Sequence, residues 1–308
     1  MTVVSVALWR FLSRIYGRWW FGPAPEWERV RARVVAGTRY ARAPREVRVD
    51  NGRVGSVPAE ILTPRAAPAD AAVLYLHGSG FVIGAPQMVR PLSGGIAAAM
   101  RTTVYALDYR LAPEHPYPAA VEDTVEAYQA LLDRGIPAER IAVVGDSAGG
   151  TLALDLAQRL RDRHLPAPAI LGLLCPVLDF STDSEAFHCD PSREPLLTPE
   201  LMARFMDAYL PGVPDPERRA LSPVNRDLTG LPPMVLHSAG DDLLAGDARR
   251  FAARAAKSGV PLRHREYRNL WHVFHAMPMR PAREAVHDFS RMLAEAVYGH
   301  HTGYRSGQ

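Results

Sequence analysis

Residues 140–150 read RIAVVGDSAGG, and this stretch decides the fold. Four β-prone apolar residues lead directly into GDSAG at 145–149, and a helix-forming sequence follows. A strand that runs through G-x-S-x-G into a helix predicts a sharp turn that exposes the serine hydroxyl above one end of a sheet. Bulky residues would clash at the two glycine positions, so glycine suits both. We therefore predict that Ser147 is a nucleophile on a strand-to-helix turn.

Strands and helices alternate on both sides of this turn. Short apolar runs predict buried strands, and longer helix-forming stretches separate them. The expected strands are 46–50, 54–62, 71–77, 103–108, 140–145, 169–175, 234–239 and 262–267, and the expected helices are 86–100, 118–132, 148–163, 246–258 and 282–298. Such alternation is typical of an α/β fold in which helices cover both faces of a mostly parallel central sheet.

The alternation stops over residues 180–226, which are irregular and rich in proline, with one helix expected at 198–210. This block is too long for a plain loop. Folds of this class place their sites at the carboxyl ends of the strands, so we expect the block to form a helical cap there. The predicted organisation is an N-terminal helical part of the cap (1–40), a core in two parts (41–179 and 227–298) that flank the insertion, and a polar tail (299–308).

A second motif, HGSGF at 77–81, follows the strand expected at 71–77. Small residues let backbone N–H groups approach an oxygen that becomes negatively charged, as in the tetrahedral intermediate of acyl transfer. The glycines at 78, 80 and 84 also come close to the dinucleotide-binding pattern G-x-G-x-x-G, but their spacing is one residue too long. We therefore expect a loop that stabilises an oxyanion, rather than a dinucleotide site.

Three motifs together resemble the hormone-sensitive lipase family of α/β-hydrolases, which includes many bacterial carboxylesterases. They are HGSGF at 77–81, DYRLAPEHPYPAA at 108–120 and GDSAGG at 145–150, and the resemblance runs from about residue 40 to 298. It implies an α/β-hydrolase fold and a role for the middle motif in bracing the oxyanion loop. It also implies that the oxyanion accepts from the amides of Ser79, Gly80 and Ala148, with His77, Gly78 and Asp146 supporting them. Serine at 79 departs from the family's usual HGGG loop.

A serine hydroxyl needs a base to take its proton, and the base needs an orienting carboxylate that precedes it along the chain in this fold. Asp241 follows the strand expected at 234–239 and aligns with the family's acid, and Asp242 and Asp247 are its competitors. Adjacent side chains point apart, so only one of Asp241 and Asp242 can face the base. His272, in the stretch NLWHVFHAM, resembles the family's W-H-x-F and is the predicted base. His275, one helical turn further on, is the alternative.

The resemblance implies hydrolysis of short to medium acyl esters through an acyl-enzyme, with no cofactor. The alternatives are a lactone or acetyl-ester hydrolase with the same triad, and a non-catalytic ligand-binding protein on the same fold. Apolar side chains are expected either to line the substrate pocket or to pack the cap on the body: Phe81, Phe205, Met206 and Trp271. No HExxH, CxxC or tight His/Asp cluster is evident, so we expect no metal.

Composition excludes several classes of protein. The chain has 308 residues, 47% of them hydrophobic, which argues against disorder. Its formal net charge of +3, from 36 basic and 33 acidic residues, is too small to imply a nucleic-acid partner. No run of about 18 uncharged apolar residues exists, so we expect no membrane span. Two cysteines make no disulfide framework, which favours a reducing, cytoplasmic location.

Two features bear on surfaces. Leu8, Phe11, Leu12, Ile15 and Trp19 follow the spacing of one helix face. We expect this face to pack on the protein body, with a membrane-touching flap as the alternative. The strand at 262–267 is expected at an edge of the sheet, where it can pair two protomers into a homodimer, as in relatives.

Overall fold

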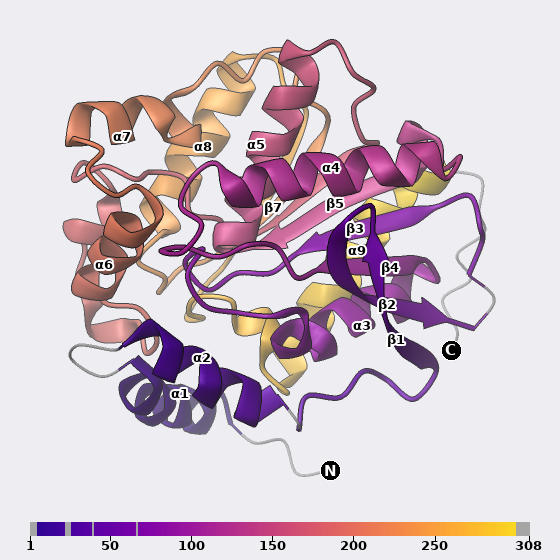
Figure 1. Ribbon diagram of the computed structural model, residues 1–308. Coiled ribbons are helices and arrows are strands. Elements are labelled where there is room, and N and C mark those ends of the chain that lie inside the picture. The colour runs from indigo at the N-terminus through magenta and orange to yellow at the C-terminus, as the bar shows by residue number, and fades with distance from the viewer. Residues whose placement is uncertain (1–4, 22–25, 39, 66, 300–308) are drawn as a thin grey trace.

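The computed structural model describes residues 5–21, 26–38, 40–65 and 67–299. Within these ranges the strands form one sheet of eight, in the order β1-β2-β4-β3-β5-β6-β7-β8 (Figure 1). Their bounds are β1 Val47–Val54, β2 Val57–Pro64, β3 Ala72–Leu76, β4 Thr103–Leu107, β5 Ile141–Asp146, β6 Ile170–Leu174, β7 Met234–Ala239 and β8 Leu262–Tyr267. The β1–β2 hairpin pairs antiparallel with β4, and all other pairs are parallel. The predicted α/β fold with a mostly parallel sheet is confirmed.

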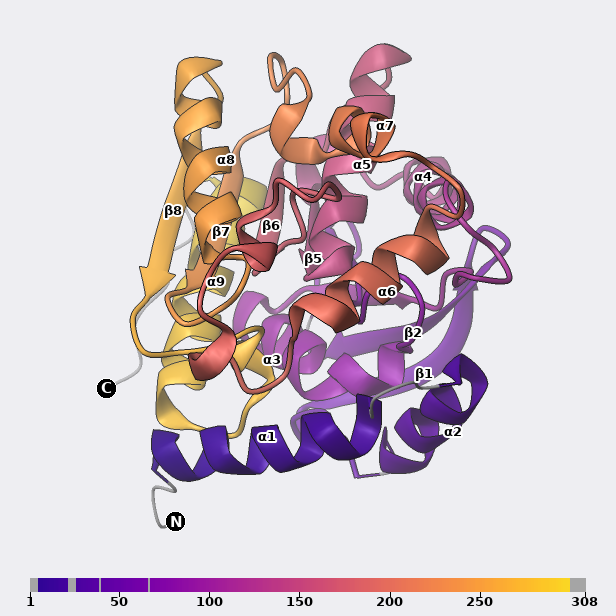
Figure 2. The same cartoon turned by 90° about the vertical axis from the view of Figure 1, so that its left-hand side faces the viewer.

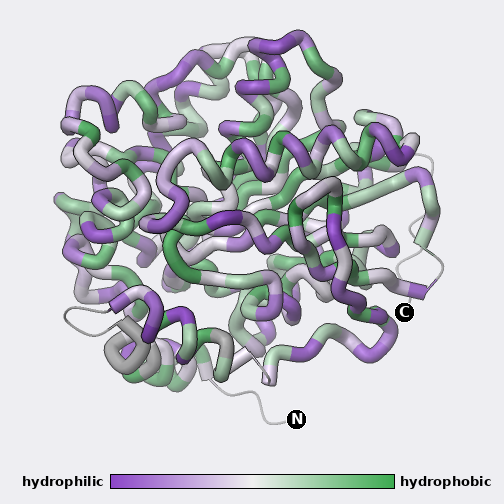
Figure 3. Tube along the Cα trace, in the orientation of Figure 1, coloured by the Kyte–Doolittle hydropathy of each residue, from purple (hydrophilic) through white to green (hydrophobic). Residues whose placement is uncertain are grey.

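Helices cover both faces of this sheet (Figure 1). On one face lie α3 (Arg90–Met100) and α9 (Arg280–Tyr298), and on the other lie α4 (Ala119–Asp133), α5 (Ala148–Asp162) and α8 (Ala245–Lys257). Successive residues of a strand point to opposite faces, so Val143 and Val144 of β5 belong to two different core clusters. Both are fully buried, which explains why this strand reads as a continuous apolar run. Figure 3 shows the same division, with hydrophobic strands inside and hydrophobic and hydrophilic residues alternating along α4.

The remaining helices lie at one side of the sheet. In Figure 2, α6 crosses in front of the strands, and α1 and α2 lie along the lower edge. Their bounds are α1 Val6–Phe21, α2 Trp27–Thr38, α6 Pro199–Tyr209 and α7 Asp215–Leu221, and the short 3₁₀ helices are η1 Pro86–Val89, η2 Ala138–Arg140, η3 Glu185–Phe187, η4 Pro191–Arg193, η5 Pro223–Asn225 and η6 Phe274–Ala276. Thr198 caps α6 by accepting from the Leu201 amide, in agreement with the helix expected there. The seven-residue α7 was not anticipated in this proline-rich block.

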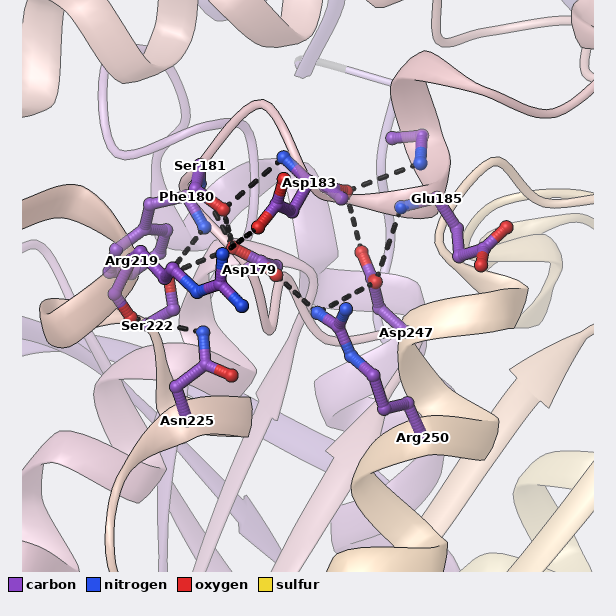
Figure 4. Close-up of polar contacts among 12 residues, drawn as sticks. Asp179, Phe180, Ser181, Asp183, Glu185, Arg219, Ser222, Asn225, Asp247 and Arg250 are labelled. Carbon is purple, nitrogen blue, oxygen red and sulfur yellow. Dashed lines mark hydrogen bonds and ion pairs between the residues drawn. The ribbon is translucent and has the colours of Figure 1, made fainter. Parts of the chain in front are cut away.

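A buried polar network ties the two ends of segment 180–226 together (Figure 4). Asp179 accepts from the backbone N–H and hydroxyl of Ser181, at 2.9 and 2.7 Å, and from the Ser222 hydroxyl at 3.0 Å. Ser222 in turn accepts from the Phe180 amide at 2.8 Å. Arg250 of α8 pairs with Asp179 and so joins this network to the core. These contacts therefore hold the first and last residues of the segment close together and connect them to α8.

The prediction for the apolar face of the N-terminal helix is wrong. Leu8, Phe11, Leu12 and Ile15 are 40–59% exposed, and the Trp19 side chain lies outside the described residues. The inward face instead carries Trp9, Arg10, Ser13 and Gly17, and a Cβ on Gly17 would lie 3.1 Å from the Pro195 carbonyl oxygen. This inward face therefore combines the partly buried Trp9 with a polar contact of Arg10, described below. Across the part of the chain described, no helix has the length and apolar character to cross a bilayer.

Candidate active site

Ser147 lies on the turn between β5 and α5 with φ 51° and ψ −120°, a conformation that non-glycine residues rarely adopt. Its amide donates to the Leu174 carbonyl at 2.8 Å, and its carbonyl accepts from the Gly150 amide at 3.0 Å. A Cβ on Gly145 would lie 2.2 Å from the Gly149 backbone, and one on Gly149 would lie 1.9 Å from the Leu76 carbonyl oxygen. The steric reason predicted for both glycines is therefore confirmed.

His272 joins this serine to a carboxylate. Its Nε2 lies 2.9 Å from Ser147 Oγ, and its Nδ1 lies 2.9 Å from Asp242 Oδ2. All three residues are buried, although β5, the loop after β7 and the loop after β8 supply them from distant parts of the chain. Such a chain of hydrogen bonds can move a proton from a hydroxyl to an imidazole while the carboxylate holds the ring. The structure thus brings the predicted nucleophile and the predicted base together.

The prediction of Asp241 as the orienting carboxylate is wrong, because Asp242 contacts His272. Asp241 points the other way, with Oδ2 lying 2.7 Å from Arg10 of α1 and Oδ1 lying 3.1 Å from Arg193. Asp242 Oδ1 also accepts from the Leu244 amide at 3.0 Å, which fixes this carboxylate ahead of α8. Neighbouring residues in the loop face opposite sides, so an alignment shifted by one position selects the wrong side chain.

Charges around His272 favour its protonated form. Burial by itself lowers the pKa of His272, but the carboxylate of Asp242, followed by those of Glu194 and Asp146, outweighs burial and raises the pKa. His275 behaves in the opposite way, because burial and then the nearby histidines lower its pKa well below the usual value. Within the described chain neither ring nitrogen of His275 has a hydrogen-bond partner. The geometry therefore favours His272 over His275 as the base.

The loop after β3 passes directly over the nucleophile. A Cβ on Gly78 would lie 2.9 Å from Ser147 Cβ and 2.3 Å from an Asp146 carboxylate oxygen. The amides of Ser79, Gly80 and Ala148 donate to no acceptor among residues 5–21, 26–38, 40–65 and 67–299. Free N–H groups beside a serine hydroxyl are what an oxyanion requires. Ser79 has φ 80°, so this serine adopts the left-handed conformation for which glycine is suited.

Two residues predicted to support the oxyanion loop, His77 and Asp146, make buried contacts beside it. The His77 ring stacks on Tyr109 with ring centroids 4.3 Å apart, and the Tyr109 hydroxyl donates to the His77 carbonyl at 2.6 Å. Asp146 accepts from the Tyr75 hydroxyl at 2.8 Å, and burial raises the pKa of its carboxyl to about 6. Tyr109 belongs to the DYRLAPE stretch, so the bracing implied by the family resemblance has a direct contact behind it.

Arg31 of α2 adds a brace that the sequence did not reveal. Its guanidinium donates to the Val82 and Ala112 carbonyls at 2.7 and 2.5 Å, and it pairs with Glu114 at 2.8 Å. Ala112 and Glu114 belong to DYRLAPE, and Val82 directly follows the HGSGF motif. The N-terminal helices are therefore connected to the candidate site on two sides, through Arg31 and through Arg10.

The four predicted pocket residues have different surroundings. Phe205 of α6 lies on the oxyanion loop, since a Cβ on Gly80 would fall 2.3 Å from its ring. Phe81 is buried in a stack on Tyr209 with centroids 3.7 Å apart, and Met206 is buried in the same core cluster. Trp271 is fully buried in a separate cluster, with the Arg10 guanidinium 5.1 Å from its ring centroid. Packing therefore describes Phe81, Met206 and Trp271, and Phe205, which is buried in the same cluster as Phe81, packs against Gly80 of the oxyanion loop.

A groove of about 1020 Å³ lies between α1 and cap residues 190–204. Leu196, Leu197 and Leu201 give it an apolar wall, and Glu194 belongs to the same wall. Because Glu194 also contacts the backbone of His272, this groove lies next to the candidate site.

Cys175, Asp242 and His272 place three atoms that could bind a metal within 4.8 Å of one another, a cluster that the sequence analysis did not anticipate. Asp242 and His272 are already hydrogen-bonded to each other, and His272 is hydrogen-bonded to Ser147. Burial, and then the charge of Asp242, raises the pKa of the Cys175 thiol well above its usual value, so the sulfur stays protonated. This donor set suits proton transfer better than metal binding.

Comparison with known proteins agrees with this geometry. The chain belongs to the alpha/beta hydrolase fold family, whose profile matches residues 73–276. LipR of Mycobacterium tuberculosis is 37% identical over 258 residues, which are 83% of each protein. An acetyl-hydrolase of Streptomyces hygroscopicus is 40% identical over 203 residues, which are 66% of this chain and 68% of the relative. The crystal structure of an esterase from the bacterial hormone-sensitive lipase family superposes with a TM-score of 0.88 at 31% identity, covering 96% of this chain and all of the other.

Proposed function

We propose that this chain hydrolyses carboxylic esters with short acyl groups, through an acyl-enzyme formed on Ser147. Membership of the family and relatives that are esterases make it a carboxylic ester hydrolase. The single observation that carries the residue assignment is the buried chain Ser147–His272–Asp242, with 2.9 Å at each link.

In the proposed mechanism, His272 Nε2 removes the hydroxyl proton while Ser147 Oγ attacks the ester carbonyl carbon. Asp242 accepts from Nδ1–H, holds the ring and stabilises the imidazolium. The amides of Ser79, Gly80 and Ala148 stabilise the oxyanion. The imidazolium then protonates the leaving alkoxide, and His272 next activates a water that cleaves the acyl-enzyme and restores the serine.

The preference for a short acyl group rests on the position of Phe205. Its ring lies against Gly80 and stacks on Trp27 of α2 with centroids 5.4 Å apart. The helices α2, through Trp27, and α6, through Phe205, therefore cover the oxyanion loop and limit the space for an acyl chain beside it. The acetyl-hydrolase named among the relatives favours acetyl esters as a second candidate within the same chemistry. Longer chains would have to reach the groove beside α1.

Hydrolysis of p-nitrophenyl esters with two to sixteen acyl carbons tests this proposal, with Ser147→Ala as the matched control. We expect activity that is highest at short chains and absent in the variant. A folded wild-type protein that hydrolyses no member of the series, or a variant that keeps the activity, would refute the proposal. Inactivity on these esters would also return the lactonase and ligand-binding alternatives to consideration.

We also propose that two protomers pair along β8 and that the enzyme is cytoplasmic. The edge position of β8 supports pairing, because an edge strand leaves half of its backbone groups unpaired. The free thiols of Cys175 and Cys189 support a reducing compartment. Sedimentation of wild type beside His264→Pro, a change in β8, tests the pairing. We expect a dimer for the wild type and a monomer for the variant.

A further inference from the structure

Glu194 brings a second carboxylate to the backbone of the proposed base. It follows η4 in the cap, and it is only 6% exposed. Its Oε2 accepts from the backbone N–H of His272 at 2.9 Å, and its Oε1 accepts from the Leu196 amide at 2.8 Å. The Glu194 side chain thus connects the backbone of His272 to the backbone of Leu196, which lines the groove beside α1.

Such a carboxylate is costly to bury, because amide donors compensate only part of its lost hydration. No cation contacts the Glu194 carboxylate within the described residues. Burial, and then the charge of Asp242, raises the pKa of Glu194 above its usual value. A glutamine or an apolar residue would remove this cost, so the glutamate needs an explanation beyond packing.

The residue beside it points to the same loop. Arg193 pairs with Asp241 at 3.1 Å, while Glu194 binds the peptide of His272. Asp241 and Asp242 are adjacent, as are Arg193 and Glu194, so two consecutive cap residues contact the loops of the acid and of the base. Arg10 of α1 binds Asp241 from the other side at 2.7 Å.

We propose that Glu194 is a positioning residue for His272, which holds the peptide of the base in place and adds a second negative charge that stabilises the imidazolium. The proposal rests on the proposed esterase function. Proton transfer from Ser147 then depends on a correctly seated cap, because the cap supplies both the hydrogen bond and the charge. Glu194 acts through His272 and is not assigned a contact with substrate.

Several other groups share this environment and enter any pH profile. The charged and titratable groups around His272 and Glu194 are Asp242, Asp146, Cys175, His275, Asp241, Arg193 and Arg10. Substitution of residue 194 leaves all of these side chains in place but removes a charge that acts on His272 and Cys175, so the profile is compared with that of a control variant that removes a different buried carboxylate.

The test compares kcat/KM for p-nitrophenyl butyrate against pH in wild type, Glu194→Gln and a control, Asp247→Asn. Asp247 is also a fully buried carboxylate that accepts a backbone N–H from the cap, that of Glu185 at 3.3 Å (Figure 4), but it is not among the charges that act on His272. Glu194→Gln removes a negative charge that stabilises the imidazolium, so the pKa of His272 should fall. We expect the acidic limb of the profile to move down by about 0.5–1 pH unit. KM should stay within about twofold, and kcat should fall severalfold.

A second measurement does not need turnover. The ¹⁵N NMR titration of the His272 ring, in Ser147→Ala and in Ser147→Ala/Glu194→Gln, should show the same downward shift. An unmoved limb and an unmoved titration in Glu194→Gln would overturn the proposal, as would an equal shift in Asp247→Asn. An inactive wild type would instead refute the esterase function, so the two failures can be told apart.

Discussion

Exchanging Asp242 for asparagine tests how the two adjacent acids divide their roles. Asp242 Oδ2 lies 2.9 Å from His272 Nδ1 in a buried pair. An asparagine there can present its NH₂ to Nδ1, which favours the imidazole tautomer that carries its proton on Nε2 and cannot accept from Ser147. In a serine protease the equivalent change lowers kcat by about 10⁴, or about 5.5 kcal/mol of barrier. We expect a loss of that order here.

Asp241→Asn is the matched control, because it makes the same chemical change one residue away. It weakens the contacts with Arg10 and Arg193, at 2.7 and 3.1 Å, and leaves His272 alone. Charged hydrogen bonds of this kind contribute about 1.5–3 kcal/mol, so the variant should unfold at a lower temperature and keep kcat within about tenfold.

The assay is kcat for p-nitrophenyl butyrate with both variants, together with thermal unfolding followed by circular dichroism. If Asp241→Asn loses about 10⁴ in kcat while Asp242→Asn stays active, then the reasoning from the His272 contacts is refuted. If both variants lose activity equally with unchanged unfolding temperatures, the proposed division between the two acids fails as well.

Three further predictions concern individual side chains. His272→Ala should abolish turnover, whereas His275→Ala should retain most of it at a cost in stability, because the buried His275 ring contacts Phe274 and not Ser147; loss of turnover in both folded variants would contradict the choice of base. Burial lowers the pKa of His237 to about 3, whereas in the unfolded chain the ring titrates near the usual 6.5. As the pH falls from 6.5 toward 3, the unfolded state takes up a proton that the folded state does not. The fold therefore loses stability over this range, by about 2 kcal/mol at pH 5. His237→Leu should therefore shrink the difference in urea stability between pH 7 and pH 5 by about that amount, and an unchanged difference would show that other groups control acid unfolding. Ser79→Gly should keep activity and change the free energy of unfolding by no more than about 1 kcal/mol, since glycine relieves the φ of 80° but gains freedom in the unfolded chain; a large loss of kcat would mean that the serine hydroxyl, and not its amide, takes part.

Local patterns predicted the parts of the site that depend on local geometry. The turn at Ser147 needs a strand, two glycines and a helix in succession, so its sequence carries the whole requirement. The strands and helices of the core followed for the same reason, because strands buried on both faces read as short continuous apolar runs and helices buried on one face read as longer periodic stretches. His272 also lies in a short, recognisable stretch.

Contacts between distant segments could not be predicted in this way. Asp241 and Asp242 have the same chemistry, and what distinguishes them is that Asp241 pairs with Arg10 of α1 and with Arg193, both far away in the sequence, while Asp242 contacts His272. The inward face of α1 carries Arg10, which pairs with Asp241, whereas Leu8, Phe11 and Ile15 are exposed, so the apolar spacing indicated the wrong inward face. Glu194 is one of several acids in an irregular segment, and no periodicity or motif marks it.

The most direct test of the central claim is covalent labelling with a fluorophosphonate, followed by mass spectrometry of the labelled peptide. We expect one adduct, on Ser147, that is absent in Ser147→Ala and strongly reduced in His272→Ala at neutral pH. A folded wild-type protein that takes no label, or one labelled on another serine that Ser147→Ala leaves unchanged, would contradict that claim.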